Sequence, residues 1–414
     1  HTRLAHSLGA CRNAELAMTK VFREDRLYTR NGPDGIRLSD ERKAYYTRLA
    51  KVAAMLHDLG HGPLSHALDI HIGIRSGMNT IKPDREFSKR YIDKYLRRVI
   101  EQAEVRPDDV VRLMEKDKQD LDDWMTFIGD LIDSPLDVDR MDYLARDAHM
   151  TGLSIGALNM QALIERIVPF REVEKHGKTK VELTFDESAV PYVEQFLYAR
   201  DVMYILCYEH PEKIVAEQML GRAFDELVSS GSPQERIDIQ ELALLTDPQI
   251  LELILASCGP RTLAYEMAEL LMRGVTYDPL VSLPLDLTLA SEKRPLEVRR
   301  WIKAVSKDQY EKAYLAIPGD WAKELVESAQ FDDHASVIVT VPSWSIVNNW
   351  MKEGEIRILI READGTYIPK YVHELSSVLK EFTTTLMRER LKIRVFVHPR
   401  LSRERRKALR ESAV

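Results

Sequence analysis

The sequence has little cysteine and no long apolar run. Its three cysteines, Cys11, Cys207 and Cys258, are scattered and show no CxxC spacing. This pattern excludes a disulfide framework and is typical of a reducing compartment, so we predict a cytoplasmic protein. The most apolar stretches, Val52–Leu56 and Val337–Val341, are far shorter than a membrane span. We therefore expect no membrane partner. Internal repeats are also absent, which excludes repeat architectures.

Charge of both signs is plentiful but unevenly placed. The 414 residues carry a formal net charge of −7, with 44% hydrophobic and 30% charged residues, as in ordinary globular proteins. This length predicts two or three structural units. The acidity does not favour a nucleic-acid partner, although it leaves one open. Arg388–Arg410 contains ten Lys or Arg against two Glu. This basic tail suits either a polyphosphate or other anionic partner, or a solvated helix face.

Apolar residues at helical spacing predict that most of the chain is α-helical. The polar segment Arg23–Asp40 contains Asn31-Gly32-Pro33-Asp34-Gly35 and is predicted to be an exposed loop. Two β-type segments, Val168–Glu172 and Lys180–Phe185, flank Lys175-His176-Gly177-Lys178 and predict a β-hairpin. The predicted helices are Ala10–Phe22, Glu41–Leu59, Phe87–Ala103, Leu121–Ile132 and several between Val190 and Met272.

The last third of the chain predicts a smaller α+β unit. Gly274–Leu287 contains two prolines and is predicted to be a connector. Val372–Arg388 is predicted to be a helix. Ser336–Pro342, Glu355–Arg361 and Lys392–His398 are predicted to be strands. We therefore predict a mainly α fold with three parts: a helical core (1–165), a β-hairpin with further helices (166–275) and a C-terminal α+β unit with a basic tail (276–414).

The central motif is the run His57-Asp58-Leu59-Gly60-His61-Gly62-Pro63-Leu64-Ser65-His66. It follows Leu49–Leu56, a mostly apolar helix whose burial makes an ionisable pair at its end costly unless something compensates. A divalent cation bound by the first two side chains of the run is the simplest compensation. The two glycines end this helix and the proline suits the first turn of the next. His61 and His66 can then turn back toward the same point.

Two ligands do not hold a catalytic metal, so further ligands must come from elsewhere. One source is His1-Thr2-Arg3-Leu4-Ala5-His6-Ser7-Leu8-Gly9, which opens a helix. Another is the segment Leu136–Asp147, in which Asp139, Tyr143 and Asp147 recur every four residues and share one helix face. A face with two carboxylates and a phenol is not a core face, so this segment is a candidate for chemistry.

In this order, the three segments resemble the HD superfamily, and within it the deoxynucleoside triphosphate triphosphohydrolases (the dGTPase and SAMHD-like proteins). The resemblance is carried by the HSLG helix, the HDLGHGPLSH run followed by Asp69, and the sequence DVDRMDYLARDAH. It covers about residues 1–215. It implies an HD-domain helical core whose nucleotide pocket is completed by residues 166–275. It also implies metal-dependent hydrolysis of deoxynucleoside triphosphates to deoxynucleoside and triphosphate.

The resemblance implies a metal site made of His6, His57, Asp58 and Asp139. Two imidazoles and two carboxylates form a mixed nitrogen and oxygen site, which suits Mn, Mg, Fe or Zn and does not choose among these divalent ions.

The catalytic residues implied by the resemblance are His61, His66 and Asp69. His66 would be the general acid that protonates the departing 5′-oxygen, and Asp69 would orient it and raise its pKa. His61 would contact phosphate.

The resemblance also implies the substrate-binding residues. Arg3 and Arg140 would hold phosphate oxygens. Tyr143 resembles the residue that packs under the deoxyribose, and Asp147 resembles one that bonds the 3′-hydroxyl.

A further helix resembles the family helix that closes over the nucleotide, because Arg200, Tyr204 and Tyr208 recur every four residues on it. Arg200 would reach phosphate and Tyr208 would stack near the sugar or base. Tyr204 would join this face, although an aromatic residue at helical spacing equally suits a core.

One departure from the family pattern concerns Arg85-Glu86, which stands where the family usually carries a His-Glu pair. An arginine can bind phosphate, but it stays charged and is a poor proton shuttle. His71 and His149 lack partners at motif spacing, and we predict structural roles for them. Asp137 is predicted to be a helix N-cap and Asp142 a structural residue.

Two other functions stay open beside the triphosphohydrolase. One keeps the HD metal site but acts on another nucleotide or on single-stranded nucleic acid. The other is a catalytically weak nucleotide sensor, which the departure at Arg85 motivates. By analogy with the family we also expect a homo-oligomer and a regulatory nucleotide.

Overall fold

The computed structural model describes residues 1–75, 84–115, 121–173, 179–230, 244–284, 320–329, 334–340, 355–381 and 392–413. They belong to two compact units that alternate along the chain. Unit 1 comprises His1–Gly60, Asp84–Tyr204 and Met351–Thr383, and unit 2 comprises His61–Pro83, Ile205–Trp350 and Thr384–Val414. Within the described ranges, no helix is long and apolar enough to span a membrane.

The helices of unit 1 begin where side chains cap them. α1 (Arg3–Glu24) follows Thr2, whose hydroxyl accepts a hydrogen bond from a backbone N–H of the first turn. α8 (Val138–Thr151) follows Asp137, whose carboxylate does the same at 2.8 Å, so the predicted N-cap is confirmed. The other α-helices of this unit are α2 (Asp40–Leu56), α4 (Asp84–Tyr91), α5 (Arg97–Gln102), α6 (Pro107–Met114), α7 (Asp123–Ile132), α9 (Met160–Ile164), α10 (Val190–Met203), α18 (Val372–Leu375) and α19 (Ser377–Glu381).

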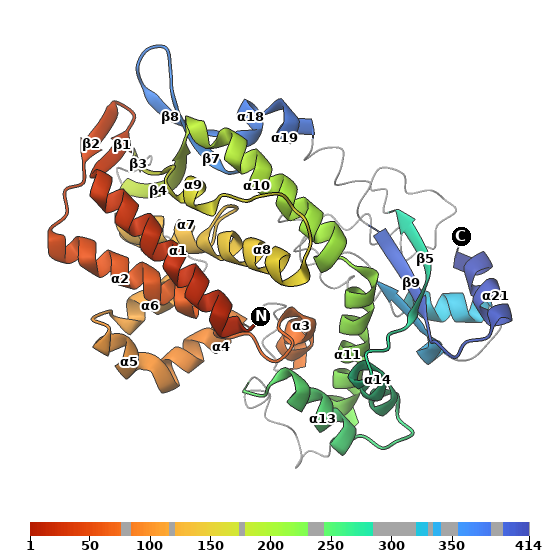
Figure 1. The fold of residues 1–414 in the computed structure, drawn as a ribbon. Helices are drawn as coiled ribbons and strands as arrows, with labels where there is room; N and C mark the ends of the chain where they lie inside the picture. The colour runs from red at the N-terminus through yellow and green to blue at the C-terminus, as the bar shows by residue number, and fades with distance from the viewer. Residues whose placement is uncertain are drawn as a thin grey trace. The chain divides into compact units, whose positions relative to one another are not determined.

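Small side chains let α1 pack closely against α2 and α8 (Figure 1). The buried faces of α1 and α2 are lined by alanines with at most 1% exposure, namely Ala10, Ala14, Ala17, Ala50, Ala53 and Ala54. Because an alanine projects little beyond the backbone, two such faces allow a close approach of the helix axes. This packing holds the start of α1 and the end of α2 in a fixed relation, which matters for the site described below.

Six strands of unit 1 form a mixed sheet in the order β2-β1-β3-β4-β7-β8. β3 (Ile167–Val173) and β4 (Thr179–Asp186) pair antiparallel, which confirms the predicted hairpin. Its turn, residues 174–178, lies outside the described residues. The remaining strands of this sheet are β1 (Arg26–Thr29), β2 (Gly32–Gly35), β7 (Arg357–Arg361) and β8 (Tyr367–Tyr371).

The segment Arg23–Asp40 is largely exposed, as predicted, but the prediction that it is a loop is wrong. The segment forms the antiparallel hairpin of β1 and β2, and Tyr28 of β1 pairs in parallel with Phe170 of β3. The strands have four residues each, which is too short and too polar to give a clear alternation in the sequence. Gly32, the first residue of β2, has φ of +125°, which only glycine adopts without strain. The glycine and proline of this segment therefore indicated a turn and not the strand.

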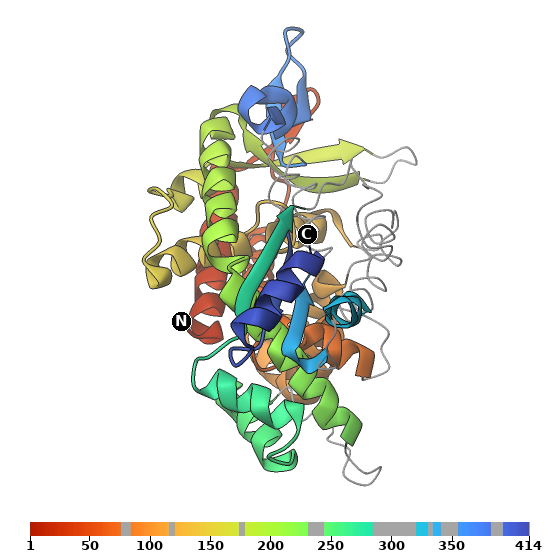
Figure 2. The same cartoon turned by 90° about the vertical axis from the view of Figure 1, so that its right-hand side faces the viewer.

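Unit 2 contains a three-stranded antiparallel sheet. β9 (Lys392–Val397) is its central strand, between β5 (Asp278–Pro284) and β6 (Val337–Thr340). In Figure 2 the blue helix α21 (Arg403–Ala413) lies along β5, and the two elements are in contact. The other described α-helices of this unit are α3 (His66–Arg75), α11 (Pro211–Ser230), α13 (Asp247–Ser257) and α14 (Leu263–Met272).

β5 overturns the connector predicted over Gly274–Leu287. The two prolines that suggested a connector both occupy positions that a strand tolerates. Pro279 lies at a register shift against β9, and Pro284 is the last residue of the strand. β5 is also an edge of its sheet in the described part of the chain, so one side of its backbone needs no strand partner.

The strands predicted at Ser336–Pro342, Glu355–Arg361 and Lys392–His398 are present as β6, β7 and β9. The helix predicted over Val372–Arg388 is instead interrupted at Ser376, whose backbone is extended (φ −112°, ψ 115°), so that α18 and α19 are separate. Residues 382–388 lie outside the described residues. With these corrections the fold is mainly α, as predicted, with two small sheets.

Candidate metal centre

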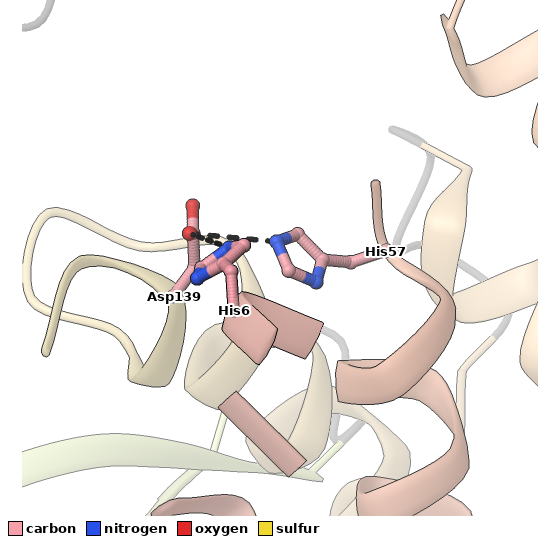
Figure 3. A group of neighbouring side chains, drawn as sticks. All are labelled: His6, His57 and Asp139. Carbon is pink, nitrogen blue, oxygen red and sulfur yellow. Dashed lines mark ion pairs between the residues drawn. The ribbon is translucent and has the colours of Figure 1, made fainter. Parts of the chain in front are cut away.

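Three helix ends of unit 1 bring together the residues predicted to bind a metal. His6 lies in the second turn of α1, His57 is the C-cap residue of α2, and Asp139 lies in the first turn of α8. Asp58 directly follows His57. Figure 3 shows the imidazoles of His6 and His57 and the carboxylate of Asp139 converging on one point. One ligand atom from each of these three lies within 4.8 Å of the others.

The distances among the four side chains are those between neighbours around a single ion. His6 Nε2 lies 3.1 Å from Asp139 Oδ1 and 3.5 Å from Asp58 Oδ2. His57 Nε2 lies 3.4 Å from the same Asp139 oxygen and 3.3 Å from Asp58 Oδ1. Ligand atoms bonded at about 2.1 Å to one ion in tetrahedral or octahedral geometry are separated by about 3.0–3.4 Å. One atom each of His6, His57 and Asp139 therefore fits a divalent metal ion, and Asp58 would reach it through one of the two oxygens that face the histidines.

A buried nitrogen gives independent support for this fit. Nε2 of His57 is inaccessible to solvent and makes no hydrogen bond within the described residues. The other ring nitrogen, Nδ1, lies 2.7 Å from the carbonyl oxygen of Ala54 and donates to it. Nε2 is then the lone-pair nitrogen, and a buried lone pair without a donor is costly unless a cation or proton occupies the position it faces.

Electrostatics at the centre favour positive charge. Burial disfavours the imidazolium form of His6, but hydrogen bonds to Asp139, Asp142 and Asp58 outweigh burial and raise its pKa to about 12. Burial likewise opposes protonation of His57, and the nearby Asp58 and Asp139 raise its pKa to about 9. For Asp139, burial alone would raise the pKa, but the two histidines hold it well below its usual range. A divalent cation would satisfy the same demand for positive charge.

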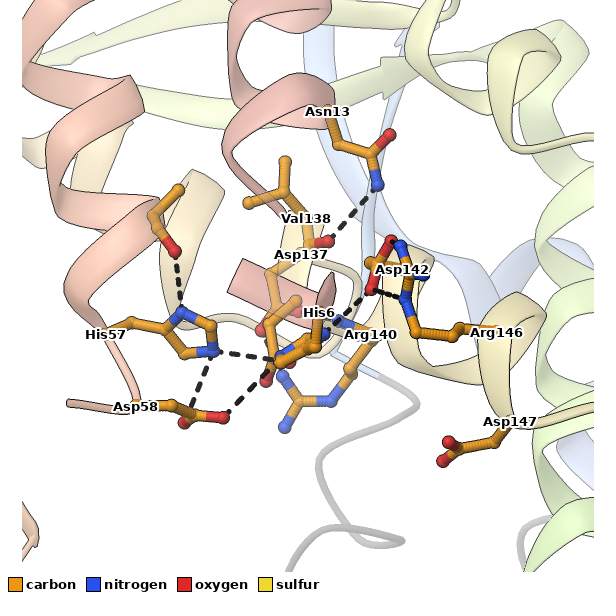
Figure 4. Close-up of polar contacts among 12 residues, drawn as sticks. His6, Asn13, His57, Asp58, Asp137, Val138, Arg140, Asp142, Arg146 and Asp147 are labelled. Carbon is orange, nitrogen blue, oxygen red and sulfur yellow. Dashed lines mark hydrogen bonds and ion pairs between the residues drawn. The ribbon is translucent and has the colours of Figure 1, made fainter. Parts of the chain in front are cut away.

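A further contact around His6 was not predicted from the sequence. Its Nδ1 lies 2.8 Å from Oδ2 of Asp142, and Arg146 donates two hydrogen bonds of 2.8 Å to the same carboxylate (Figure 4). Burial raises the pKa of Asp142, but the hydrogen bonds from Arg146 and His6 outweigh it and leave the pKa lowered. Gly9 makes room for this arrangement, because a Cβ there would lie 1.7 Å from Asp142 Oδ1.

Four of the predicted substrate residues gather within unit 1. Arg140 donates through Nη1 to Asp137 and to the carbonyl of Ser134, while its buried Nε makes no hydrogen bond within the described residues. Arg200 is 1% exposed and its guanidinium carbon lies 5.2 Å from the ring centre of Tyr204. Burial and Tyr204 raise the pKa of Tyr143 above its usual range, and Arg200 and Arg140 oppose this shift. The four side chains are therefore close enough to interact electrostatically.

The other predicted substrate residues are placed differently. Asp147 accepts a hydrogen bond of 2.7 Å from the imidazole of His1, and Arg3 is exposed at the start of α1. Tyr208 belongs to unit 2. The predicted common face of Arg200, Tyr204 and Tyr208 is not kept, because α10 ends at Met203 and a π-helix follows over Tyr204–Tyr208. A π turn contains an extra residue and rotates the later side chains away from α-helical spacing.

The predicted catalytic residues form a separate cluster within unit 2. Nδ1 of His61 and Nδ1 of His66 lie 2.9 and 3.0 Å from the same oxygen, Oδ2 of Asp69. Burial raises the pKa of Asp69, but the hydrogen bonds from both histidines outweigh it and hold the pKa below its ordinary value. His61 and Asp69 are buried, whereas the side chain of His66 is 80% exposed. This cluster could also accommodate a metal ion by distance alone.

The backbone between the two clusters departs from the prediction. α3 begins at His66, three residues after the proline that was expected to start it. Leu64 and Ser65 have φ of 56° and 48°, a left-handed conformation that non-glycine residues rarely adopt. Gly60 does not have positive φ. It is needed for space, because a Cβ there would lie 1.7 Å from the carbonyl oxygen of Asp84.

Arg85 and His71 each have hydrogen-bond partners that account for their presence as structural residues. Arg85 donates to Asp133 at 2.7 Å and to the carbonyl oxygen of Met114 at 3.2 Å, so its guanidinium is held by protein acceptors. His71 lies 2.9 Å from Asp225, and a Cβ at Gly221 would come within 2.2 Å of its ring. The histidine therefore packs α3 against α11, in agreement with the structural role expected for it.

Comparison with known proteins relates the chain to HD-domain proteins. Residues 170–276 match a family model described as an HD associated region. A protein of Acanthamoeba polyphaga mimivirus, whose name describes it as HD domain-containing, is 26% identical over 63% of this chain and 55% of its own length. An uncharacterised protein of Methanocaldococcus jannaschii is 27% identical over 60% of this chain and 43% of its own length. The matched regions thus span about half of these relatives.

A solved structure shares the fold. The crystal structure of a hypothetical protein from Aquifex aeolicus superposes with a TM-score of 0.63, covering 99% of this chain and 87% of that one at 22% identity. Taken together, the family-model match and the HD-domain relative support an HD-domain family for this chain.

Proposed function

We propose that this protein is a metal-dependent phosphohydrolase that cleaves deoxynucleoside triphosphates to deoxynucleoside and triphosphate. The observation that carries the proposal is the convergence of His6, His57, Asp58 and Asp139, with the buried Nε2 of His57 facing two carboxylates. HD-type motifs with such donors are typical of metal-dependent phosphohydrolases, and the motif resemblance points to the triphosphohydrolase branch.

The groups near the centre suit a polyphosphate substrate. Arg140 and Arg200 are cations in a largely buried setting, and the pKa of Arg140 is raised further, against burial, by Asp137 and Tyr143. Asp137 offsets part of this charge. Positive charge held in a low-dielectric site stabilises the negative charge of phosphoryl oxygens, which is most of the work in phosphoryl chemistry. The buried Nε of Arg140 offers a donor for one such oxygen.

In the reaction that we propose, water attacks the α-phosphorus and the bond to the 5′-oxygen breaks. The water oxygen stays with the triphosphate, and the 5′-oxygen takes up a proton to become the hydroxyl of the deoxynucleoside. His66, oriented by Asp69, would supply that proton. A divalent ion held by the four ligands would supply Lewis-acid polarisation of phosphate. Tyr143 would exclude a 2′-hydroxyl and Asp147 would bond the 3′-hydroxyl after release from His1.

The test is product analysis with the purified protein. Each deoxynucleoside triphosphate, singly and mixed, would be incubated with Mn²⁺ or Mg²⁺ and with chelator, beside GTP, dGMP and single-stranded DNA, and the products separated by ion exchange. We expect deoxynucleoside and intact triphosphate, absent with chelator and with Asp58→Ala. Turnover of only dGMP or DNA would show that the substrate is not a deoxynucleoside triphosphate. Tight binding without turnover would favour a nucleotide sensor.

A further inference from the structure

The two histidines of the metal centre are fixed by different means. His57 donates through Nδ1 to the carbonyl oxygen of Ala54, three residues earlier in the same segment. His6 instead directs Nδ1 to a side chain from another helix, the carboxylate of Asp142, at 2.8 Å. A backbone carbonyl cannot be removed by substitution, whereas a carboxylate can. The orientation of His6 therefore depends on the identity of a residue 136 positions away.

The geometry defines which nitrogen of His6 carries the proton. An ionised carboxylate only accepts hydrogen bonds, so Nδ1 of His6 is the donor to Asp142. Its Nε2 lies on the other side of the ring, 3.1 Å from Asp139 and 3.5 Å from Asp58. A neutral imidazole with a proton on Nδ1 has its lone pair on Nε2, which is the form that binds a metal ion.

Asp142 is itself held in place. Nε and Nη2 of Arg146 donate to its two oxygens, each at 2.8 Å, which is the two-point geometry that fixes both position and rotation of a carboxylate. The side chains of His6 and Asp142 are 7% and 9% exposed, so water competes little for the hydrogen bond between them.

The sequence of α1 is adapted to this contact. His6 and Gly9 are one turn apart on the face toward α8, and a Cβ at Gly9 would lie 1.7 Å from Oδ1 of Asp142 and 2.5 Å from Nη2 of Arg146. Any side chain at position 9 would thus displace the two groups that orient His6. The contact between His6 and the Asp142–Arg146 pair therefore requires glycine at position 9.

We infer that Asp142 is a positioning residue for the metal centre: it holds His6 with Nε2 toward the site, and Arg146 holds Asp142. The sequence pattern predicts only a structural role for Asp142. This inference deepens the proposed function, since it rests on a metal ion at the centre. It does not depend on which phosphate ester the protein cleaves.

Metal affinity is the readout that separates positioning from simple stability. We would titrate the metal-free protein with Mn²⁺ and measure free Mn²⁺ by electron paramagnetic resonance, in wild type and Asp142→Asn. Loss of an acceptor behind a ligating histidine weakens metal binding about 10- to 100-fold. The matched control is Asp109→Asn, which changes another buried carboxylate that is held by an arginine, Arg106, and by Tyr45. In the described part of the chain this carboxylate has no histidine partner. We expect its Mn²⁺ affinity to equal that of wild type.

Two more variants keep the test valid if Asp142→Asn does not fold. Arg146→Gln changes a half-buried side chain and should weaken Mn²⁺ binding in the same direction by less. Gly9→Ala should also weaken it, although no charge is lost. Combined with Asp142→Asn, Gly9→Ala should add little, because both changes break one contact.

A spectroscopic readout completes the test. In protein loaded with diamagnetic Zn²⁺ and labelled with ¹⁵N-histidine, the His6 signals should show a proton on Nδ1, and this proton should exchange faster with water in Asp142→Asn. Folded Asp142→Asn with wild-type Mn²⁺ affinity would overturn the inference. Wild type that binds Mn²⁺ but hydrolyses no deoxynucleoside triphosphate would instead contradict the proposed function and leave the inference standing.

Discussion

The two histidine clusters use the same residue types in opposite ratios. In unit 1, two histidines face three carboxylates, those of Asp58, Asp139 and Asp142. In unit 2, two histidines share one carboxylate oxygen of Asp69. An excess of carboxylates requires positive charge beyond what the imidazoles supply. In the second cluster one carboxylate is shared by two imidazoles, and the exposed His66 can reach solvent or substrate for proton transfer.

This difference is what the proposed function requires of one short motif that would serve two tasks. His57 and Asp58 end a buried helix beside carboxylates from the rest of unit 1, so that His57 presents a buried nitrogen. His66, eight residues after Asp58, has a side chain that is 80% exposed, and its Nδ1 lies 3.0 Å from Asp69. A metal ligand must be buried and fixed, while a general acid must reach the substrate and exchange its proton.

Removing a carboxylate from the first cluster should have the largest effect. Asp139→Asn keeps the shape of the side chain but removes its negative charge from beside the two imidazoles. We therefore expect the protein to lose its bound metal. Because the metal stabilises the transition state by several kcal/mol, kcat should fall about 10³-fold or more. Metal content by atomic emission and initial rates check this. Retention of stoichiometric metal with wild-type kcat would show that the first cluster is not the metal centre.

Changing the second cluster should lower the rate without removing metal. We expect His66→Gln to reduce kcat roughly 10²- to 10⁴-fold, as for loss of a general acid, with metal content unchanged. His149→Gln alters an exposed histidine that contributes to neither cluster and serves as the control. If His66→Gln lost its metal together with its activity, the assignment of the two clusters to separate tasks would be wrong.

The smallest expected effect is on stability in acid. The pKa of Asp69 is lower in the folded protein than in the unfolded chain, where it is about 3.9. The charged carboxylate therefore stabilises the fold fully at pH values above about 3.9. This contribution is lost as the pH falls through the lower pKa of the folded protein. Asp69→Asn should therefore be less stable than wild type by about 1–3 kcal/mol near neutral pH. The difference should shrink below about pH 4. Urea unfolding from pH 3 to 7 measures it, and a pH-independent difference would argue against the charged hydrogen bonds.

The candidate metal ligands could be predicted from the sequence because each motif places its chemical groups within a few residues. His57 and Asp58 stand next to each other, and the capping Asp137 stands two residues before Asp139, so local sequence is enough to suggest a site. Asp142 and Gly9 could not be recognised in this way. Their roles depend on the distance between α1 and α8, which no local pattern encodes. The general tendency of a metal-bound histidine to have a carboxylate behind it was the only available signal.

The errors in the fold have a common physical origin. β1 and β2 have four residues each and contain glycine and proline, and the longer strand β5 contains two prolines. These segments are stable as strands because they pair with β3 and β9. The pattern of a single sequence shows the turn-forming residues, but it does not show which distant strand the segment will pair with. The π-helix at Tyr204–Tyr208 is a similar case, because its residues have ordinary helical spacing in the sequence.

Metal-dependent release of intact triphosphate can be tested by the position of an oxygen isotope in the products. Metal-loaded protein would be given a deoxynucleoside triphosphate in H₂¹⁸O, and the separated products weighed by mass spectrometry. We expect one ¹⁸O in triphosphate and none in the deoxynucleoside, with no reaction in chelator. Label in orthophosphate or pyrophosphate, or an unchanged rate without divalent metal, would contradict it.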